Sequence, residues 1–433
     1  MRLIVPGDDG YDAARRIWNL DADRRPAVIA CCTSGTDVRR ALELARTDHL
    51  DLAVRGGGHS QAGFSVCDGG VVVDLAGLNA IDVHPGRDAV RVGAGARVGA
   101  LIDALTPVGL VTPTGGCPDV GLGGLTLGGG ESFLMGKLGT VSDSLLSAEI
   151  VTADGATITA SADSHPDLFW ALRGGGGNFG IATSFTLRTY PIDRVLAGRF
   201  MFPVSRTREV VRIYRDLIAE APDEFQTSGG IVSRPVTTDG EAEVAVTLFI
   251  EVCHCGAAND ANGLVDRWRA SLRPDSDDVA WGPYAATLIL PPIASSGTGA
   301  FVPELNDPVV DILSDYFLSA PPSCTAAWND HHGAVTRIPV AATAFPLRQR
   351  GFDLFVHAGW KTPALRPGAL EWLTGLSRQL QPFASGVYVN SLGNEPPDRT
   401  AEAYGPNYAR LRTVKSIYDP GNVFRGNHNI PPA

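Results

Sequence analysis

The chain has 433 residues, 50 of them glycine, and a formal net charge of −11 with an isoelectric point near 5.3. This length exceeds what one ordinary hydrophobic core holds, so we expect two domains. The acidic balance, without a basic stripe, argues against nucleic acid as a partner. No apolar run reaches the roughly 18–20 residues of a membrane helix, so no membrane partner is expected either.

The cysteines and the N-terminus indicate a reducing compartment. Seven cysteines are an odd, sparse set for this length and do not form a disulfide framework. The first residues, MRLIVPGDDG, lack the apolar segment of a secretion signal. We therefore expect a cytoplasmic protein.

Residues 26–190 alternate short β-rich runs with glycine turns. Helices are expected over 36–49, where Thr36 and Asp37 are good N-cap residues, and over 97–109. This order predicts a β-α-β unit followed by a meander, and it lacks the regular alternation of a doubly wound sheet.

From about residue 195 the pattern becomes α+β, with longer amphipathic helices between strands. Helices are expected over 205–222, 257–273 and 368–383, strands over 241–253, 352–360 and 386–392, and loops near 291–303 and 320–325. The last 30 or so residues are expected to form one helix, a turn and a short terminal segment.

Two short motifs have weak contexts. Cys253-His254-Cys255 could suggest zinc, but no second ligand pair follows at zinc spacing, which favours buried strand cysteines. Gly175-x-Gly177-x-x-Gly180 matches a dinucleotide-binding fingerprint formally. A helix-like segment precedes it and a strand-like one follows, the reverse of what a Rossmann unit requires.

The segment Arg55-Gly-Gly-Gly-His59-Ser60 follows a strand and leads into no helix. Consecutive backbone N–H groups in such a turn bind anions, and a diphosphate is a natural occupant. The alternative is a tight surface turn with a solvated histidine. A second glycine cluster, residues 112–130, surrounds Cys117. We expect an exposed thiol in a flexible loop against which a large planar or phosphorylated ligand lies, and the alternative is an incidental thiol.

Four stretches together resemble the berberine bridge enzyme-like branch of the FAD-linked oxidases, which have the vanillyl-alcohol-oxidase (PCMH-type) fold. They are RGGGHS at 55–60, GGCPDVGLGG at 115–124, AEIVTADG with PDLFWALRGGGGNFGI between 148 and 181, and Tyr388-Val-Asn390 with YDPGNVFRGNHNI at 418–430. The resemblance implies an α+β protein with an FAD-binding domain (1–193), a substrate domain with an antiparallel sheet flanked by helices (194–395), and a C-terminal segment (396–433) that returns to the FAD domain.

The resemblance also implies roles for single residues. His59 and Cys117 match the residues that bond FAD covalently, and Val120 matches the position where valine accompanies reactivity with O2. Tyr388 matches the residue that removes the substrate's proton, for which it needs a lowered pKa. His357 and, more distantly, Asp353 would face the flavin from one strand. The remaining expected FAD contacts are Arg55, Gly56, Gly57, Gly58, Ser60, Gly63, Gly116, Gly121, Gly124, Gly128, Val151, Gly177, Asn178, Gly180, Ile181, Asn390, Asn427 and Asn429.

The sequence departs from the family pattern at Ser132, where the family has glycine, at Gly136, where it has arginine, at Leu347 within its F-P-H-R stretch, and at His428, where it has glutamine. These changes put the substrate class in doubt. We expect a bicovalent FAD oxidase, a monomer or homodimer, that removes hydride from an alcohol or other activated C–H of a sugar or secondary metabolite and reduces O2 to H2O2. An oxidative cyclase or dehydrogenase and, less favoured, a non-catalytic flavin-binding protein are the alternatives. No metal is expected.

Overall fold

A computed structural model describes residues 1–238, 241–285 and 292–433. The N-terminal sheet combines parallel and antiparallel strands in the order β1-β2-β4-β3, with β1 antiparallel to β2 and the other pairs parallel. Helix α2 (Gly35–Thr47) joins β2 to β3, and the Ser34 side chain caps it by accepting from the Asp37 N–H. The β-α-β prediction is confirmed. The strands are β1 (Arg2–Ile4), β2 (Val28–Cys31), β3 (Leu52–Arg55) and β4 (Val71–Asp74).

A second sheet is entirely antiparallel, in the order β5-β6-β9-β7-β8. Its strands are β5 (Ile81–Val83), β6 (Ala89–Gly93), β7 (Leu145–Val151), β8 (Thr157–Ser161) and β9 (Ile181–Arg188). Short helices lie between them: α3 (Val98–Leu105), α4 (Leu122–Leu127), α5 (Met135–Leu138) and α6 (Pro166–Ala171). Helix α6 precedes, and strand β9 follows, the third glycine segment (residues 174–180), as the sequence predicts.

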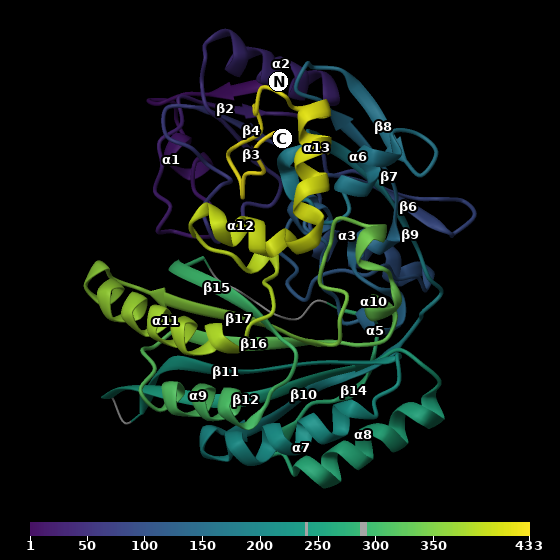
Figure 1. Cartoon of the computed structure of the whole chain (residues 1–433), viewed down its shortest axis with the longest axis vertical. Coiled ribbons are helices and arrows are strands. Elements are labelled where there is room, and N and C mark those ends of the chain that lie inside the picture. The colour runs from purple at the N-terminus through teal and green to yellow at the C-terminus, as the bar shows by residue number, and fades with distance from the viewer. Residues whose placement is uncertain (239–240, 286–291) are drawn as a thin grey trace.

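The third and largest sheet has the order β13-β10-β12-β11-β16-β17-β15, with β14 also paired to β10, and all its pairs are antiparallel. Figure 1 shows it crossing the middle of the molecule, with helices along its lower side. The strands are β10 (Val195–Pro203), β11 (Phe225–Thr238), β12 (Glu241–His254), β13 (Ser276–Asp277), β14 (Ala280–Gly282), β15 (Ala294–Val302), β16 (Cys324–His331) and β17 (Gly351–Trp360), and the helices are α7 (Thr207–Ala219), α8 (Ala258–Leu272), α9 (Asp307–Leu318) and α11 (Arg366–Leu380).

Alternation along these strands separates two faces of the large sheet. One set of side chains, such as Phe200, Trp328 and Leu354, is fully buried in a core shared with the four helices. The intervening residues point to the opposite face, which lines the cavity described below. This two-sided pattern is what a strand periodicity of two produces when both faces are covered.

The C-terminal segment returns to the N-terminal sheets, and Figure 1 shows α12 (Pro397–Tyr404) and α13 (Tyr408–Tyr418) beside them. Leu411, Val414 and Ile430 belong to the same apolar core as the first two sheets. Lys415 is fully buried, and its Nζ donates to the Asn178 carbonyl (2.8 Å), the Asp419 carboxylate (2.7 Å) and the Phe424 carbonyl (3.0 Å). This lysine therefore ties the C-terminal turn to the third glycine segment. The remaining short helices are α1 (Tyr11–Ala14) and α10 (Ala334–Arg337).

Three local predictions are wrong. The loop expected near 291–303 contains strand β15, because it pairs with all of β17; residue 291 itself lies outside the described part of the chain. The strand expected over 386–392 is a 3-10 turn (Val389–Ser391) with one isolated bridge, Phe301 to Gly386. The flexible glycine loop expected around Cys117 ends in helix α4, whose Leu122 and Leu127 are buried.

Candidate functional site

One cavity of about 1140 Å³ lies between the glycine segments of the N-terminal part and the open face of the large sheet. It exceeds the roughly 300–1,000 Å³ of common small-molecule pockets, so it has room for a large cofactor and a substrate together. Of the predicted site residues, it is lined by Gly56, Gly57, Gly58, His59, Ser60, Gly116, Val120, Gly121, Gly124, Gly177, Asn178, Gly180, Ile181, Asp353, His357, Tyr388, Asn390 and Asn427.

The first glycine segment presents backbone donors to the cavity. The N–H groups of Gly57, Gly58 and His59 donate to no partner within the described residues. Gly58 has a φ of +76°, the left-handed conformation that glycine tolerates best. A Cβ at Gly57 would lie 2.2 Å from the Gly121 nitrogen, so the first and second glycine segments touch backbone to backbone. Three consecutive free donors on a rigid support form an anion-binding nest, suited to a diphosphate.

The third glycine segment and the C-terminus form another wall. The Asn178 side chain donates to the Gly175 carbonyl, and its Oδ1 accepts from the Ile430 N–H. Asn427 donates to the Gly177 carbonyl, while its Oδ1 is buried without a partner among the described residues. A Cβ added at Gly124 or Gly177 would meet no atom within 4 Å. Free donors, an orphaned acceptor and uncovered glycine backbone fit a large phosphorylated cofactor such as FAD.

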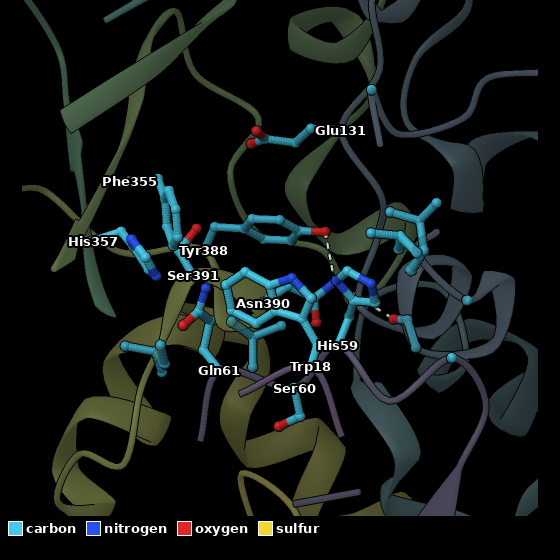
Figure 2. Close-up of a pocket in the computed structure, with 18 of the residues that line it drawn as sticks. Trp18, His59, Ser60, Gln61, Glu131, Phe355, His357, Tyr388, Asn390 and Ser391 are labelled. Atoms are coloured by element: carbon cyan, nitrogen blue, oxygen red, sulfur yellow. Dashed lines mark hydrogen bonds between the residues drawn. The ribbon is translucent and has the colours of Figure 1, made fainter. Parts of the chain in front are cut away.

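Two histidines face this cavity from opposite sides of Trp18. The Trp18 ring stacks on His59 at 5.4 Å between centroids and lies tilted against His357 at 5.7 Å (Figure 2). Burial, and to a smaller extent the like charge of Arg97, lower the pKa of His59 to about 4. Burial alone lowers the pKa of His357 to about 4, and its Nε2 has no partner in the described part of the chain. Both imidazoles are therefore neutral at pH 7, with lone pairs available for bonding.

Tyr388 lies at the start of the 3-10 turn, and its hydroxyl oxygen accepts two hydrogen bonds. The Gly130 N–H donates to it at 2.9 Å and the Asn390 side-chain amide at 2.8 Å. The lowered pKa that Tyr388 needs for its expected role in removing the substrate's proton is not found. Burial and the neighbouring carboxyl group of Glu131 raise this pKa well above its ordinary value. At neutral pH Tyr388 is a phenol, suited to donating a hydrogen bond.

Asp353, Phe355 and His357 alternate along β17 and line the same cavity, as the strand pattern predicts. Burial, and then the neighbouring carboxyl group of Glu131, raise the pKa of Asp353 well above its usual range. The sequence analysis missed Glu131, which lines the same cavity as Tyr388 and is drawn above the Tyr388 ring in Figure 2. Its position directly after Gly128–Gly130 is the signal that could have identified it, because two left-handed glycines turn the chain sharply there.

Six predicted FAD contacts lie outside the cavity lining, and most support it from behind. Arg55 forms an ion pair with Asp74 at 2.8 Å, and a Cβ at Gly128 would collide with the Asn390 amide. The Cys117 thiol is buried, with 4% of the residue exposed, so its expected exposure is wrong; its neighbour Gly116 reaches the lining. The other three are Gly63, which packs on Ala22, Val151, which is buried at the end of β7, and Asn429, whose Oδ1 is buried without a partner among the described residues.

The Cys253-His254-Cys255 motif contributes to packing. Both cysteines are buried, as predicted, in an apolar cluster with Val111 and Tyr284. Within the described residues, no group of three or more histidine, cysteine or acidic side chains is arranged to hold a metal ion.

Comparison with known proteins identifies the family. The family described as FAD binding domain matches residues 26–161, and the one described as berberine and berberine like matches residues 387–431. An uncharacterised FAD-linked oxidoreductase of Bacillus subtilis, YgaK, is 31% identical, the match covering 100% of this chain and 97% of the relative. The (R)-6-hydroxynicotine oxidase of Paenarthrobacter nicotinovorans is also 31% identical, over 99% of this chain and 96% of that protein.

This chain belongs to the berberine-like FAD-linked oxidases. The predicted family, the mixed helix-and-sheet fold and the oxidoreductase activity are thereby confirmed. The crystal structure of 6-hydroxy-D-nicotine oxidase from Arthrobacter nicotinovorans superposes on this oxidase with a TM-score of 0.89 at 29% identity, covering 100% of this chain and 98% of that one. The described helices of this oxidase include none with the length and apolarity to span a membrane.

Proposed function

We propose that this protein is a cytoplasmic FAD-dependent oxidase that takes hydride from an alcohol or other activated C–H of a secondary metabolite or sugar and passes the electrons to O2, yielding H2O2. The observation that carries the proposal is the cavity of about 1140 Å³, in which glycine N–H groups without a partner among the described residues face the polar side chains of β17. FAD bound there supplies the acceptor for the hydride and its re-oxidation by O2.

The cofactor side of the cavity would be formed by the glycine segments. Gly57, Gly58 and the N–H of His59 would hold the diphosphate, because their donors are free. The neutral imidazole of His59 supports its proposed role as a covalent anchor, because only an unprotonated ring nitrogen is a nucleophile. A second bond through Cys117 would require this buried thiol to turn toward Gly116 and the cavity. Val120, which lines the cavity, would leave space for O2.

The substrate side would be formed by β17 and Tyr388. When hydride leaves an alcohol carbon, the hydroxyl proton must also leave. The free Nε2 of His357 is the group best placed to take it, because it is neutral and has no protein partner among the described residues. The Tyr388 phenol would donate a hydrogen bond to the substrate oxygen as negative charge develops there. Phe355, between Asp353 and His357 on the cavity face, favours a substrate with an apolar surface.

The covalent claim is tested by acid precipitation of the purified protein. We expect flavin to stay with the wild-type precipitate and, in separate His59→Ala and Cys117→Ala proteins, to stay attached through the remaining residue. Only the double variant should release all of its FAD into the supernatant. Free FAD from the wild type would refute covalent attachment, and full release from His59→Ala alone would leave a single bond, through His59.

The oxidase claim is tested by anaerobic reduction with a panel of alcohols and cyclic amines, followed by admission of air. Reduction of the flavin absorbance, rapid re-oxidation and one H2O2 per turnover are expected. We also expect His357→Gln to lower kcat/KM at least tenfold, as loss of a proton acceptor typically does. A flavin that no compound reduces would point to a carrier protein. A product with a new ring would point to an oxidative cyclase.

A further inference from the structure

The N-terminal segment around Trp18 joins the first glycine segment to the edge of the large sheet. The Trp18 N–H donates to the Gly58 carbonyl at 3.0 Å, and the Trp18 carbonyl accepts from the Ile293 N–H at 3.3 Å. The next residue, Asn19, bonds to β15 in both directions: its Nδ2 donates to the Ser295 carbonyl at 3.1 Å, and its Oδ1 accepts from the Ser295 N–H at 3.1 Å. Trp18 lines the cavity, is only 7% exposed and is therefore held in place from both sides.

The indole ring of Trp18 is the contact that orients the imidazole of His59. The two rings are stacked, with 5.4 Å between their centroids and 22° between their planes (Figure 2). Within the described residues, no hydrogen bond is made to either ring nitrogen of His59. A stacked pair of rings favours a parallel arrangement, so it opposes rotation of the imidazole out of its plane. The direction in which the His59 nitrogens point is therefore set by the stack.

The orientation of this imidazole matters for the covalent bond proposed above. In that bond, a ring nitrogen of His59 replaces one hydrogen of a methyl group of FAD. The methyl hydrogen and the N–H hydrogen leave as protons, and these two protons and two electrons pass to O2, which becomes H2O2. Such a bond forms only when the nitrogen lone pair is aimed at the reacting carbon, and a misplacement of about 1 Å costs roughly 100-fold in rate. A residue that fixes the imidazole therefore controls how fast FAD is attached.

We propose that Trp18 is a positioning residue for the covalent attachment of FAD: its indole face holds the His59 imidazole in the orientation from which the bond forms. This inference rests on the proposed function, and specifically on the bond through His59. The same indole ring lies 5.7 Å from the His357 ring, tilted by 49°, so loss of Trp18 would also affect turnover. Covalent attachment is the more direct measure of the proposed role, because it needs no substrate.

The test is the rate of FAD attachment in a Cys117→Ala protein, in which His59 is the remaining predicted anchor. Apoprotein from a riboflavin-starved host is mixed with FAD in air, and acid precipitation of timed samples measures the covalent fraction. We expect Trp18→Leu to attach FAD at least about tenfold more slowly than this parent, because the imidazole loses its stacking partner. Trp18→Phe keeps a flat ring and should stay within about threefold of the parent. The Kd for FAD before attachment, measured by rapid quenching of FAD fluorescence, should change less than about threefold in both variants, because the diphosphate nest is unaltered.

The matched control is Trp281→Leu in the same parent. Trp281 belongs to β14, lies outside the cavity lining and donates through Nε1 to Asn262 at 3.0 Å, so its loss should leave the attachment rate within about twofold. If Trp18→Leu does not fold, Trp18→Met also removes the flat ring and should slow attachment in the same way.

Equal attachment rates in the parent and Trp18→Leu overturn the inference. A tenfold weaker Kd for FAD in Trp18→Leu also overturns it, because the residue would then have a general structural role. Release of all FAD from every protein, the parent included, would instead refute the covalent part of the proposed function, and this inference with it.

Discussion

Lys415 provides a quantitative test of how the C-terminal segment stabilises the cofactor side of the cavity. Its ammonium group is fully buried and has three acceptors: the carbonyl groups of Asn178 and Phe424 and the Asp419 carboxylate. Lys415→Met keeps most of the side-chain volume and removes the charge. Asp419 would then be a buried carboxylate without its cationic partner, although it still accepts from the N–H groups of Val423 and Phe424.

Removing one partner of a buried ion pair typically costs about 3–5 kcal/mol, because the remaining charge is left in a medium that solvates it poorly. The Asn178 carbonyl loses its donor as well, at about 1–3 kcal/mol if it stays unpaired, whereas the Phe424 carbonyl keeps the hydrogen bond from the Asn427 amide. These costs are not additive, and the two N–H groups that still donate to Asp419 reduce the cost of the lost ion pair. We therefore expect Lys415→Met to lower the free energy of unfolding by about 4 kcal/mol.

Urea unfolding followed by tryptophan fluorescence measures this loss of stability. The FAD content of the purified protein gives a second measurement, because Lys415 binds the carbonyl of Asn178, which lines the cavity. The control is Lys137→Met. Lys137 lies 3.7 Å from Glu224, with 36% and 38% of the two side chains exposed. Such a surface pair contributes less than about 1 kcal/mol. If Lys415→Met and Lys137→Met were equally stable, the buried lysine would not hold the C-terminal turn and the reasoning would fail.

Two further predictions concern the glycine segments and the pH dependence of stability. Gly57→Ala should yield protein without FAD, because its Cβ would lie 2.2 Å from the Gly121 nitrogen; the ratio of flavin to protein absorbance checks this. Gly263→Ala, in an open position of α8, should instead raise the stability of the protein by about 0.5–1 kcal/mol, which its melting temperature checks. Burial lowers the pKa of His428 to about 4, below the unfolded value of about 6.5, so its contribution to stability is present above pH 6.5 and is lost as the pH falls toward 4. His428→Gln should therefore lose less of its melting temperature than the wild type between pH 6.5 and 4, and an unchanged difference would contradict this.

The local pattern of the sequence was sufficient for much of the fold. Helices α2, α3, α7, α8 and α11 and strands β12 and β17 lie within a few residues of their predicted ranges, because their apolar periodicity matches their burial. The glycines at 56–58 were also interpretable, since free N–H donors and a left-handed φ are properties of the backbone itself. Most of the residues predicted to contact FAD line one cavity.

What failed depended on distant partners. Strand β15, rich in serine and glycine, has no strand-like pattern of its own and exists because β17 pairs along its whole length. The pKa of Tyr388 is set by burial and by Glu131, 257 positions away in sequence, as their residue numbers show. Cys117 is buried by neighbours that a glycine-rich stretch does not predict. No local rule could supply these three outcomes.

The departure from the family pattern at Gly136 has a structural reason. Gly136 stands where the resemblance expected arginine, and even a Cβ there would lie 2.8 Å from His332 Nε2 and 2.6 Å from the Asp223 carbonyl. The space of the missing side chain is thus already filled by the end of β16. That same end carries His331, the partner of Glu131. An arginine at position 136 would therefore displace the His332 side chain, which already occupies the space next to Gly136. Ser132, which stands where the family pattern has glycine, lines the cavity. The compound named for a relative at 31% identity is therefore a starting point for the substrate panel only.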